Sequence, residues 1–385
     1  MDINMCFMTW LRVQSFNNTF HKTILFLVIY CGCAVSMCAQ VGKLFDAKEQ
    51  LSSSFTNQVY LDNDGFIWAA TRNGLNKYDG YQFRIFKKEI EQEEGMASNY
   101  VNAIIQDRDG LFYLGMWGAL QTYDGIKFKN VEVKDLQGRV VQPYVTCFLQ
   151  RRNGEIWAGT SGFGVIRFDD PLHARQVGGS LRNVHTASQL IEDSRGHLWI
   201  ITRNNGLLHD NGKNVHAHFT DPLYLTDLAC ICEGANGNIY VATTAHGLFR
   251  LKGDKFEKIE NTDGKPFADL YFSKRHGKLF IGYDGAGMGI YDPATGELTD
   301  NPYYSQEVDL TKCKVSSITE DRSGNLWLGM LQKDSTCSLS MTWVFHIWDI
   351  NSVHVIRLVP HASFRPLSIR KVISGWVPTK TDFMV

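Results

Sequence analysis

The sequence predicts an all-β protein, a seven-bladed β-propeller of four-stranded blades whose last blade is diverged or incomplete. The first observation is a repeat. An apolar strand, a polar turn ending in glycine and an aromatic strand recur seven times, at intervals of about 43 residues. The second is composition, because 34 glycines and 12% aromatic residues accompany few Ala-, Leu- and Glu-rich runs of the kind that favours helices. The third is length, since 385 residues suffice for one large domain or two ordinary ones.

A tight turn marks the centre of each repeat. Its sequence is Asp-x-x-Gly in the best copies, such as Asp62–Gly65 and Asp107–Gly110. Glycine supplies a positive φ angle in such a turn, and the aspartate side chain bonds its own backbone. The turns resemble the start of a calcium loop, but no glutamate follows at the twelfth position, so we expect a structural role. The turn glycines are Gly65, Gly110, Gly154, Gly196, Gly237, Gly277 and Gly324.

Four short strands surround this turn in each unit. Strand A precedes the turn, as in Asn102–Gln106, and strand B follows it with an aromatic residue, as in Ile67–Thr71. Strand C starts at a glycine, as in Gly74–Asp79, and strand D follows a further turn, as in Gln82–Phe86. A solenoid of hairpins is the alternative, but one aromatic residue per unit suits packing between blades. We expect the tryptophans of strand B to lie in the core: Trp68, Trp157, Trp199 and Trp327.

The repeat also resembles a known family. Residues 59–80 and 101–125 follow the pattern D-x-x-G-x-[IL]-W-x-G-T-x-x-G-L-x-x-[YF]-[DN]-G, which is similar to the two-component regulator propeller repeat. Such repeats form the periplasmic sensor region of hybrid two-component sensor histidine kinases of gut Bacteroidetes, and the resemblance covers residues 41–330. It implies a periplasmic propeller that senses an oligosaccharide. Intact members are inner-membrane proteins that continue into a kinase, a receiver and a DNA-binding domain, and they are expected to signal as homodimers.

The first 39 residues have the pattern of a signal peptide. Arg12 and Lys22 precede the apolar run Ile24–Val35, and small residues follow it near Ala39. The run is shorter than the roughly 20 residues that a membrane-spanning helix needs. An N-terminal anchor helix and a lipid attached to Cys38 are the alternatives. Membrane contact is therefore expected only through this signal or anchor segment.

The repeat pattern fails at the other end of the chain. After Leu326–Met330 the expected third strand is missing, and residues 331–385 contain no further repeat. A frameshift or a truncated reading frame is one interpretation. The other is a diverged last blade in which Trp343–Asp349 is strand C and Val353–Val359 is strand D, or in which the strand around Lys43–Phe45 completes the blade. No kinase or receiver motif occurs, so the resemblance implies a truncated sensor that is not itself an enzyme.

Composition and motifs exclude several functions. The 39 basic and 40 acidic residues are balanced, whereas a nucleic-acid-binding protein should show a basic excess. No catalytic constellation appears, and no cofactor is expected. The pair His216 and His218 alternates on one strand as metal ligands can, but no third ligand is visible, so no metal site is predicted.

The loops on one face of the propeller are the candidate ligand site. Strand direction alternates within a blade, so the D-to-A and B-to-C connections emerge on the same face. Aromatic, amide and arginine side chains gather in these connections, and they suit a sugar, which offers apolar C–H faces and hydroxyl groups. The candidate residues are Arg72, Asn99, Tyr100, Trp117, Tyr144, His185, Arg203, Asn204, Tyr224, His246, Tyr283 and Asp284.

Two functional hypotheses follow from these observations. The first is the extracytoplasmic, oligosaccharide-binding propeller of a hybrid sensor kinase, in truncated form. The second is a secreted propeller enzyme, a lyase or glycosidase, for which His185 and His246 are the residues to test. A remnant without function is a third interpretation.

Overall fold

The computed structural model describes residues 42–45, 51–53, 55–89, 94–302, 310–332 and 342–347. The chain divides into two compact units, Met1–Ser352 and Val353–Val385, and all described residues belong to the first. The predicted signal peptide and the predicted strand Val353–Val359 lie outside the described residues. In the part of the chain that the structure describes, no helix is long and apolar enough to cross a membrane.

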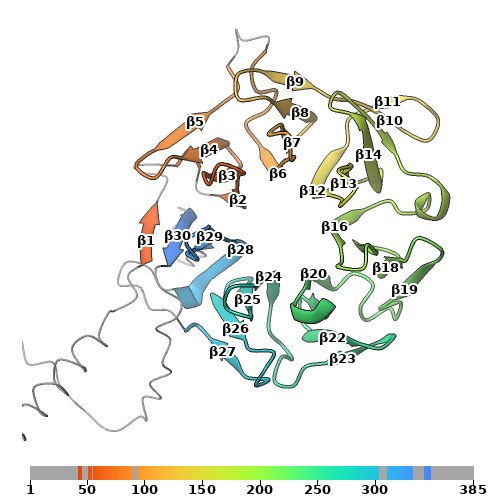
Figure 1. Ribbon diagram of the computed structural model, residues 1–385, viewed down its shortest axis with the longest axis vertical. Coiled ribbons are helices and arrows are strands. Elements are labelled where there is room, and N and C mark those ends of the chain that lie inside the picture. Colours follow the sequence, from red (N-terminus) through yellow and green to blue (C-terminus); the bar gives the residue numbers. More distant parts are fainter. Residues whose placement is uncertain are drawn as a thin grey trace, which may run out of the picture. The chain divides into compact units, whose positions relative to one another are not determined.

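The strands of the described residues form seven hydrogen-bonded sheets. Six sheets consist of strands that follow one another in the chain, and we call them blades 1 to 6 (Figure 1). The remaining sheet combines strands from the two ends of the described chain, and we call it the closing sheet. The prediction of an all-β propeller with four-stranded blades is confirmed, and blade 3 carries two additional strands.

The strands of each blade are named below from the innermost to the outermost. Blade 1 contains β2 (Thr56–Leu61), β3 (Ile67–Thr71), β4 (Gly74–Tyr78) and β5 (Phe83–Phe86). Blade 2 contains β6 (Val101–Gln106), β7 (Phe112–Met116), β8 (Ala119–Tyr123) and β9 (Phe128–Asn130). Blade 3 contains β12 (Tyr144–Gln150), β13 (Ile156–Ser161), β14 (Val165–Asp170) and β15 (His173–Gln176), with β10 (Glu132–Lys134) and β11 (Val140–Val141) added outside β15.

The other sheets follow the same order. Blade 4 contains β16 (Ala187–Glu192), β17 (Leu198–Thr202), β18 (Leu207–Asp210) and β19 (Val215–His218). Blade 5 contains β20 (Leu228–Glu233), β21 (Ile239–Thr243), β22 (Leu248–Lys252) and β23 (Lys255–Lys258). Blade 6 contains β24 (Phe267–Ser273), β25 (Lys278–Tyr283), β26 (Met288–Tyr291) and β27 (Leu298–Asp300). Among the described residues, three short 3₁₀ helices lie in the connections: η1 (Gly179–Leu181), η2 (Ala235–Gly237) and η3 (Leu310–Lys312).

The sequence predicts seven blades, the last diverged or incomplete, but only six of the described sheets consist of consecutive strands, and the closing sheet is different. It contains β28 (Cys313–Glu320), β29 (Leu326–Gln332), β30 (Thr342–Ile347) and, outermost, β1 (Gly42–Phe45). β30 covers part of the segment proposed as a diverged third strand, and β1 coincides with the Lys43–Phe45 strand proposed to complete the blade. The two are antiparallel, with Gly42 opposite Ile347. The outermost strand of the closing sheet therefore comes from the N-terminal end of the described chain and not from the repeat itself. It covers the edge of β30 that would otherwise be unpaired.

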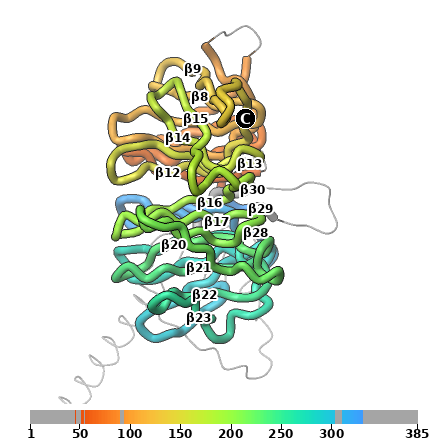
Figure 2. The backbone as a smooth tube through the Cα atoms, turned by 90° about the vertical axis from the view of Figure 1, so that its right-hand side faces the viewer, coloured from red at the N-terminus to blue at the C-terminus, as the bar shows by residue number. Residues whose placement is uncertain are grey.

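The inner strands make a closed ring. β2, β6, β12, β16, β20, β24 and β28 each contact the next, and β28 contacts β2; in the side view of Figure 2, the strands of blades 3, 4 and 5 follow one another. The pairing register of each inner strand shifts at a β-bulge or similar irregularity, and in some blades the side chain at this point bonds the next inner strand. The Asn102 amide donates to the Val145 carbonyl at 2.7 Å, and the Ser316 hydroxyl donates to the Thr56 carbonyl at 2.8 Å. The second bond joins the closing sheet to blade 1.

The Asp-x-x-Gly turns have the structural role that the sequence predicts. In blade 1, one Asp62 oxygen accepts hydrogen bonds from the backbone N–H groups of Asp64 and Phe66, at 3.0 and 2.7 Å. The other accepts the Trp68 indole N–H at 2.8 Å. Gly65 has a φ of +94°, which only glycine adopts without strain. Asp193 and Asp321 bind Trp199 and Trp327 in the same way.

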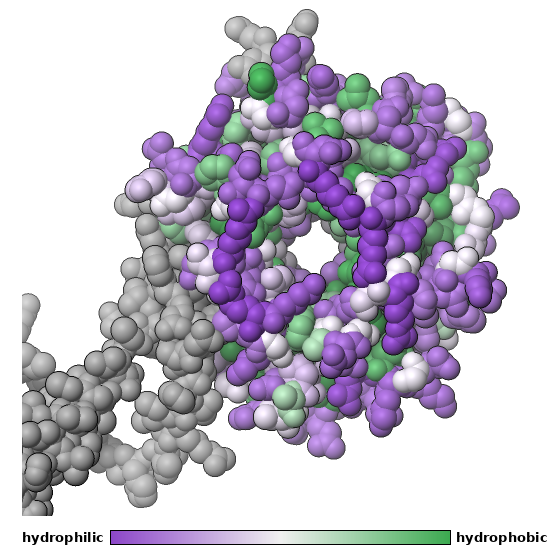
Figure 3. Space-filling model, in the orientation of Figure 1, coloured by the Kyte–Doolittle hydropathy of each residue, from purple (hydrophilic) through white to green (hydrophobic). Residues whose placement is uncertain are grey.

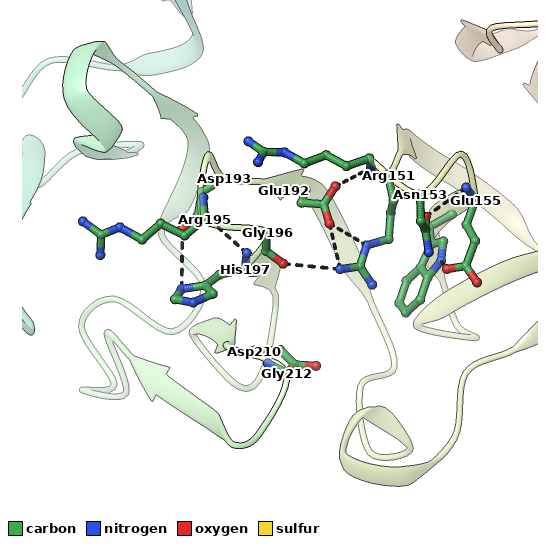
Figure 4. A network of polar contacts seen from close by, with 12 residues as sticks. Arg151, Asn153, Glu155, Glu192, Asp193, Arg195, Gly196, His197, Asp210 and Gly212 are labelled. Carbon is green, nitrogen blue, oxygen red and sulfur yellow. Dashed lines mark hydrogen bonds and ion pairs between the residues drawn. The ribbon is translucent and has the colours of Figure 1, made fainter.

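The turn of blade 3 lacks this aspartate, and a glutamate of the next blade bonds the turn instead. Arg151 stands at the first turn position, and its guanidinium pairs with Glu192 of blade 4 at 2.8 Å (Figure 4). The backbone N–H of Arg152 donates to the other Glu192 oxygen at 2.6 Å. The Trp157 indole N–H donates to Glu155 at 3.0 Å instead. The turn is therefore held by a contact between blades where the local aspartate is absent.

The core lies between the blades, as the repeated aromatic residue predicts. Trp68 packs against Phe112 of blade 2, with ring centroids 4.7 Å apart, in a cluster that also contains Leu114 and Tyr123. Burial of apolar surface in such clusters stabilises the folded state by about 25 cal/mol per Å². The prediction that the tryptophans are core residues is confirmed, since each is buried: Trp68, Trp157, Trp199 and Trp327.

Candidate ligand-binding face

One face of the ring carries the connections from second to third strands and from one blade to the next, and we call it the loop face. Arg72 lies between β3 and β4, and Trp117 lies between β7 and β8. Tyr100 directly precedes β6, and Tyr144 is the first residue of β12. Residues from blades 1, 2 and 3 therefore meet on this face.

Three of the predicted site residues form a continuous aromatic row: Tyr100, Trp117 and Tyr144. The ring centroids of Tyr100 and Trp117 are 6.0 Å apart, and those of Trp117 and Tyr144 are 5.5 Å apart. The first pair of rings is tilted, with 58° between the planes, and the second pair packs edge-on, with 69° between the planes. Trp117 is 67% exposed, so the middle ring of the row faces solvent.

An arginine extends the row into blade 1. The Arg72 guanidinium carbon lies 4.2 Å from the centre of the Phe55 ring and 5.9 Å from that of Tyr100. Stacking on aromatic faces orients the planar group while leaving its N–H donors available. The row thus ends in a cation with bidentate donor geometry.

Tyr144 is anchored by the wall of the ring. Its hydroxyl donates to the Asn102 side chain at 3.0 Å. Burial, together with the neighbouring Tyr100 hydroxyl, raises the pKa of Tyr144 well above its usual range. Tyr144 therefore stays neutral at physiological pH and remains a hydrogen-bond donor.

Two further predicted residues meet in blade 5. His246 Nδ1 is 2.6 Å from an Asp227 carboxylate oxygen, and the Thr244 hydroxyl bonds the other oxygen. The Tyr224 ring packs edge-on against the imidazole, with centroids 5.7 Å apart. Sequence reasoning missed Asp227 and Thr244, because their only signal is the spatial proximity that the loop geometry creates. A histidine held by a carboxylate is a possible acid–base group.

Four predicted residues lie on the loop face without joining either group. Asn99 braces blades 1 and 2, since its side chain accepts the Lys88 N–H at 2.6 Å and its carbonyl accepts the Gly74 N–H at 2.7 Å. The other three are exposed, at the junction of blades 3 and 4: His185, Arg203 and Asn204.

The last two predicted residues are in blade 6. The Asp284 carboxylate pairs with Lys314 of the closing sheet at 2.9 Å. Tyr283 is 2% exposed, and its hydroxyl donates to Asp300 at 2.7 Å. Tyr283 therefore lies in the core and not on the loops, because it is the last residue of β25 and packs against Phe267.

The centre of the ring contains a polar-lined cavity that the sequence did not predict. A cavity of about 300 Å³ is lined by residues of all the inner strands, and Figure 3 shows hydrophilic residues around the central opening. Asp269 lies in its wall, where its carboxylate accepts the Ile318 N–H at 2.7 Å. Burial raises the pKa of Asp269 to about 7, against the effect of backbone hydrogen bonds. Residues one repeat apart converge here, which no local pattern reveals.

Comparisons with known proteins agree with this architecture. No protein-family model matches the chain. "Histidine kinase P4" of Formosa agariphila is 35% identical over 69 residues, which are 17% of this chain and 5% of that protein. The extracellular domain of the putative hybrid two component system BT3049 from B. thetaiotaomicron superposes with a TM-score of 0.65 and 19% identity, over 79% of this chain and 42% of that chain. Virginiamycin B lyase from Staphylococcus aureus gives a TM-score of 0.57 and 15% identity, over 79% of this chain and 99% of that chain.

These similarities identify the fold that is shared. The chain spans 5% of the histidine kinase and 42% of the two component system domain, and nearly the whole length of the lyase. Of the two solved structures, the two component system domain superposes better than the lyase.

Proposed function

We propose that this chain is the extracytoplasmic, ligand-sensing propeller of a hybrid two-component sensor histidine kinase. Its location would be the periplasm, and residues 1–39 would be its leader. Its propeller would comprise residues 41–330, and the diverged tail, residues 331–385, would contribute β30 to the last sheet. The closing sheet would be the seventh blade. The similarity to a sensor extracellular domain and to a histidine kinase supports this assignment. Signalling would involve a homodimer.

The ligand would be an oligosaccharide bound at the aromatic row. The rings of Tyr100, Trp117 and Tyr144 lie one after another in space, and the exposed Trp117 offers a flat apolar surface. Pyranose rings place their C–H faces on such surfaces, while their hydroxyls need fixed donors and acceptors. Arg72 at one end of the row and the Tyr144 hydroxyl at the other would supply those polar contacts. The row is the single observation that carries this proposal.

Titration calorimetry against a panel of glycans tests the proposal. We expect the full chain to bind at least one oligosaccharide and Trp117→Ala to weaken that binding by about tenfold or more. The scale is taken from nucleic-acid bases, for which stacking on one aromatic ring contributes about 1–3 kcal/mol. Tyr81→Ala is the matched control. Tyr81 is 92% exposed between β4 and β5, on the face opposite the loops. Absence of binding to any glycan, or an equal loss in both variants, would contradict the proposal.

A second candidate function is a lyase or glycosidase on the same face. The observation in its favour is the His246–Asp227 pair, together with the propeller shared with virginiamycin B lyase. Turnover of a glycan that is abolished in His246→Ala and retained in His185→Ala would support it. Binding without turnover would favour the sensor.

A further inference from the structure

Blade 4 contains a compact cluster of three potential metal ligands, separate from the loop face. Asp193 lies in the turn after β16, His197 directly precedes β17, and His209 lies near the end of β18. His209 Nε2 is 3.0 Å from His197 Nδ1, and the same His197 atom is 3.7 Å from Asp193 Oδ2. All three ligand atoms lie within 4.8 Å of one another. Figure 4 shows the Asp193 and His197 side chains facing each other.

These separations fit a shared metal ion. Zn–N and Zn–O bonds measure roughly 2.0–2.2 Å, so two ligands at a tetrahedral angle are about 3.4 Å apart. The two observed separations fall on either side of this value, and a small side-chain adjustment would equalise them. Two imidazoles with one carboxylate also leave a coordination position open for water or a further ligand.

The surrounding residues orient two of the three ligands, Asp193 and His209. The Trp199 indole N–H donates to Asp193 Oδ2 at 2.9 Å, and the backbone N–H groups of Arg195 and His197 bond Asp193 Oδ1, each at 2.9 Å. The His209 ring stacks on Trp199, with centroids 3.8 Å apart and planes 2° apart. Metal ligands in proteins are held by such outer contacts, which fix their rotamers before the ion arrives.

We propose that Asp193, His197 and His209 form a binding site for a divalent transition-metal ion. Zn²⁺ is the natural probe, because imidazole nitrogen with one carboxylate suits borderline cations, whereas Mg²⁺ and Ca²⁺ prefer all-oxygen sites. The ion would tie the Asp-x-x-Gly turn of blade 4 to its third strand. Sugar binding at the aromatic row does not require it, so the two proposals stand independently.

Zinc titration of the full chain tests the site. The protein is purified without a histidine tag, stripped with a chelator, and titrated with Zn²⁺ and in parallel with Mg²⁺ by calorimetry at about neutral pH. We expect one Zn²⁺ per chain and no Mg²⁺ binding. His209→Phe keeps a ring to stack on Trp199 but removes the ligand atom, and we expect it to weaken zinc binding by about 100-fold or more.

His173→Ala is the matched control. His173 is an exposed histidine of blade 3 that pairs with Asp170 through its ring Nδ1, so its loss should leave zinc affinity unchanged. If His209→Phe does not fold, as judged by circular dichroism, His197→Gln replaces it. The proposal fails if the wild-type chain binds no zinc, or if the ligand variant binds as tightly as the wild type and the His173 control.

Discussion

At the scale of single residues, Asp269 takes its properties from its position in the ring. It lies half-buried on β24, at the wall of the central cavity, and accepts the Ile318 N–H. Burial raises its pKa to about 7, whereas an aspartate in an unfolded chain has a pKa of about 3.9. The folded protein therefore retains a proton on Asp269 where the unfolded chain has lost it.

This difference predicts a pH dependence of stability. Between about pH 4 and pH 7 the folded state binds more protons than the unfolded state, so the contribution of Asp269 to stability falls as the pH rises through this window. Asp269→Asn keeps an acceptor for the Ile318 N–H and cannot ionise. We expect the variant to gain stability relative to wild type between about pH 4.5 and about pH 7.5, measured by urea unfolding at both values. Parallel pH profiles would contradict this expectation.

At the scale of elements, the glycine near the end of the second strand sets the spacing between blades. A Cβ atom on Gly115 of β7 would lie 2.7 Å from the Val145 Cβ of β12, closer than any real side-chain contact. A Cβ atom on Gly159 of β13 would lie 2.7 Å from the Cys147 sulfur of its own blade and 2.8 Å from the Ala187 carbonyl oxygen of blade 4. The glycine at this position of the second strand therefore permits the next inner strand to approach. The requirement is one of packing, since neither Gly115 nor Gly159 has a positive φ.

Replacing this glycine with alanine should lower the free energy of unfolding, and the loss should be larger where the added Cβ atom lies closer to its neighbours. We expect Gly115→Ala to destabilise the protein by about 1–3 kcal/mol, because Val145 must move in a packed core. Gly329→Ala should cost less, since its nearest neighbours are side-chain carbons of Thr56 and Val59 at 3.1 Å. Urea unfolding of both variants measures the difference. Equal losses, or a larger loss for Gly329→Ala, would show that this spacing does not govern blade packing.

At the scale of the whole ring, closure depends on the N-terminal strand. Phe45 of β1 is 1% exposed, and its ring lies 6.0 Å from Trp327 of the closing sheet and 5.0 Å from Tyr78 of blade 1. One side chain therefore joins the last sheet to the first blade. The backbone pairing of β1 with β30 acts at the same junction.

Removing this side chain should weaken closure. We expect Phe45→Ala to cost about 3–5 kcal/mol of unfolding free energy, the range for large-to-small changes in a packed core. Ile85→Ala on the outer strand of blade 1 is the control, because Ile85 is 44% exposed and should change stability by about 0.5 kcal/mol or less. Chemical unfolding of both variants provides the comparison. A Phe45→Ala chain as stable as the control would show that β1 does not close the ring.

The sequence by itself determined the features that are local. The Asp62 carboxylate reaches Phe66 and Trp68 within six residues, and Gly65 needs its positive φ whatever surrounds it. The turns, the strands and the buried tryptophans could therefore be predicted from a repeated pattern. The loop face was also predictable in part, because strand direction alternates and places Arg72 and Trp117 on the same side.

Only the tertiary structure decided which distant residues meet. Tyr100, Trp117 and Tyr144 form a row because neighbouring blades pack at a fixed spacing, while Tyr283, the last residue of a second strand, lies in the core. The His197–His209 contact depends on strand register in blade 4, and the pKa of Asp269 depends on burial within the ring. Closure by β1 depends on the pairing of the two chain ends. These properties depend on register and packing between segments far apart in the chain, which a local repeat pattern does not encode.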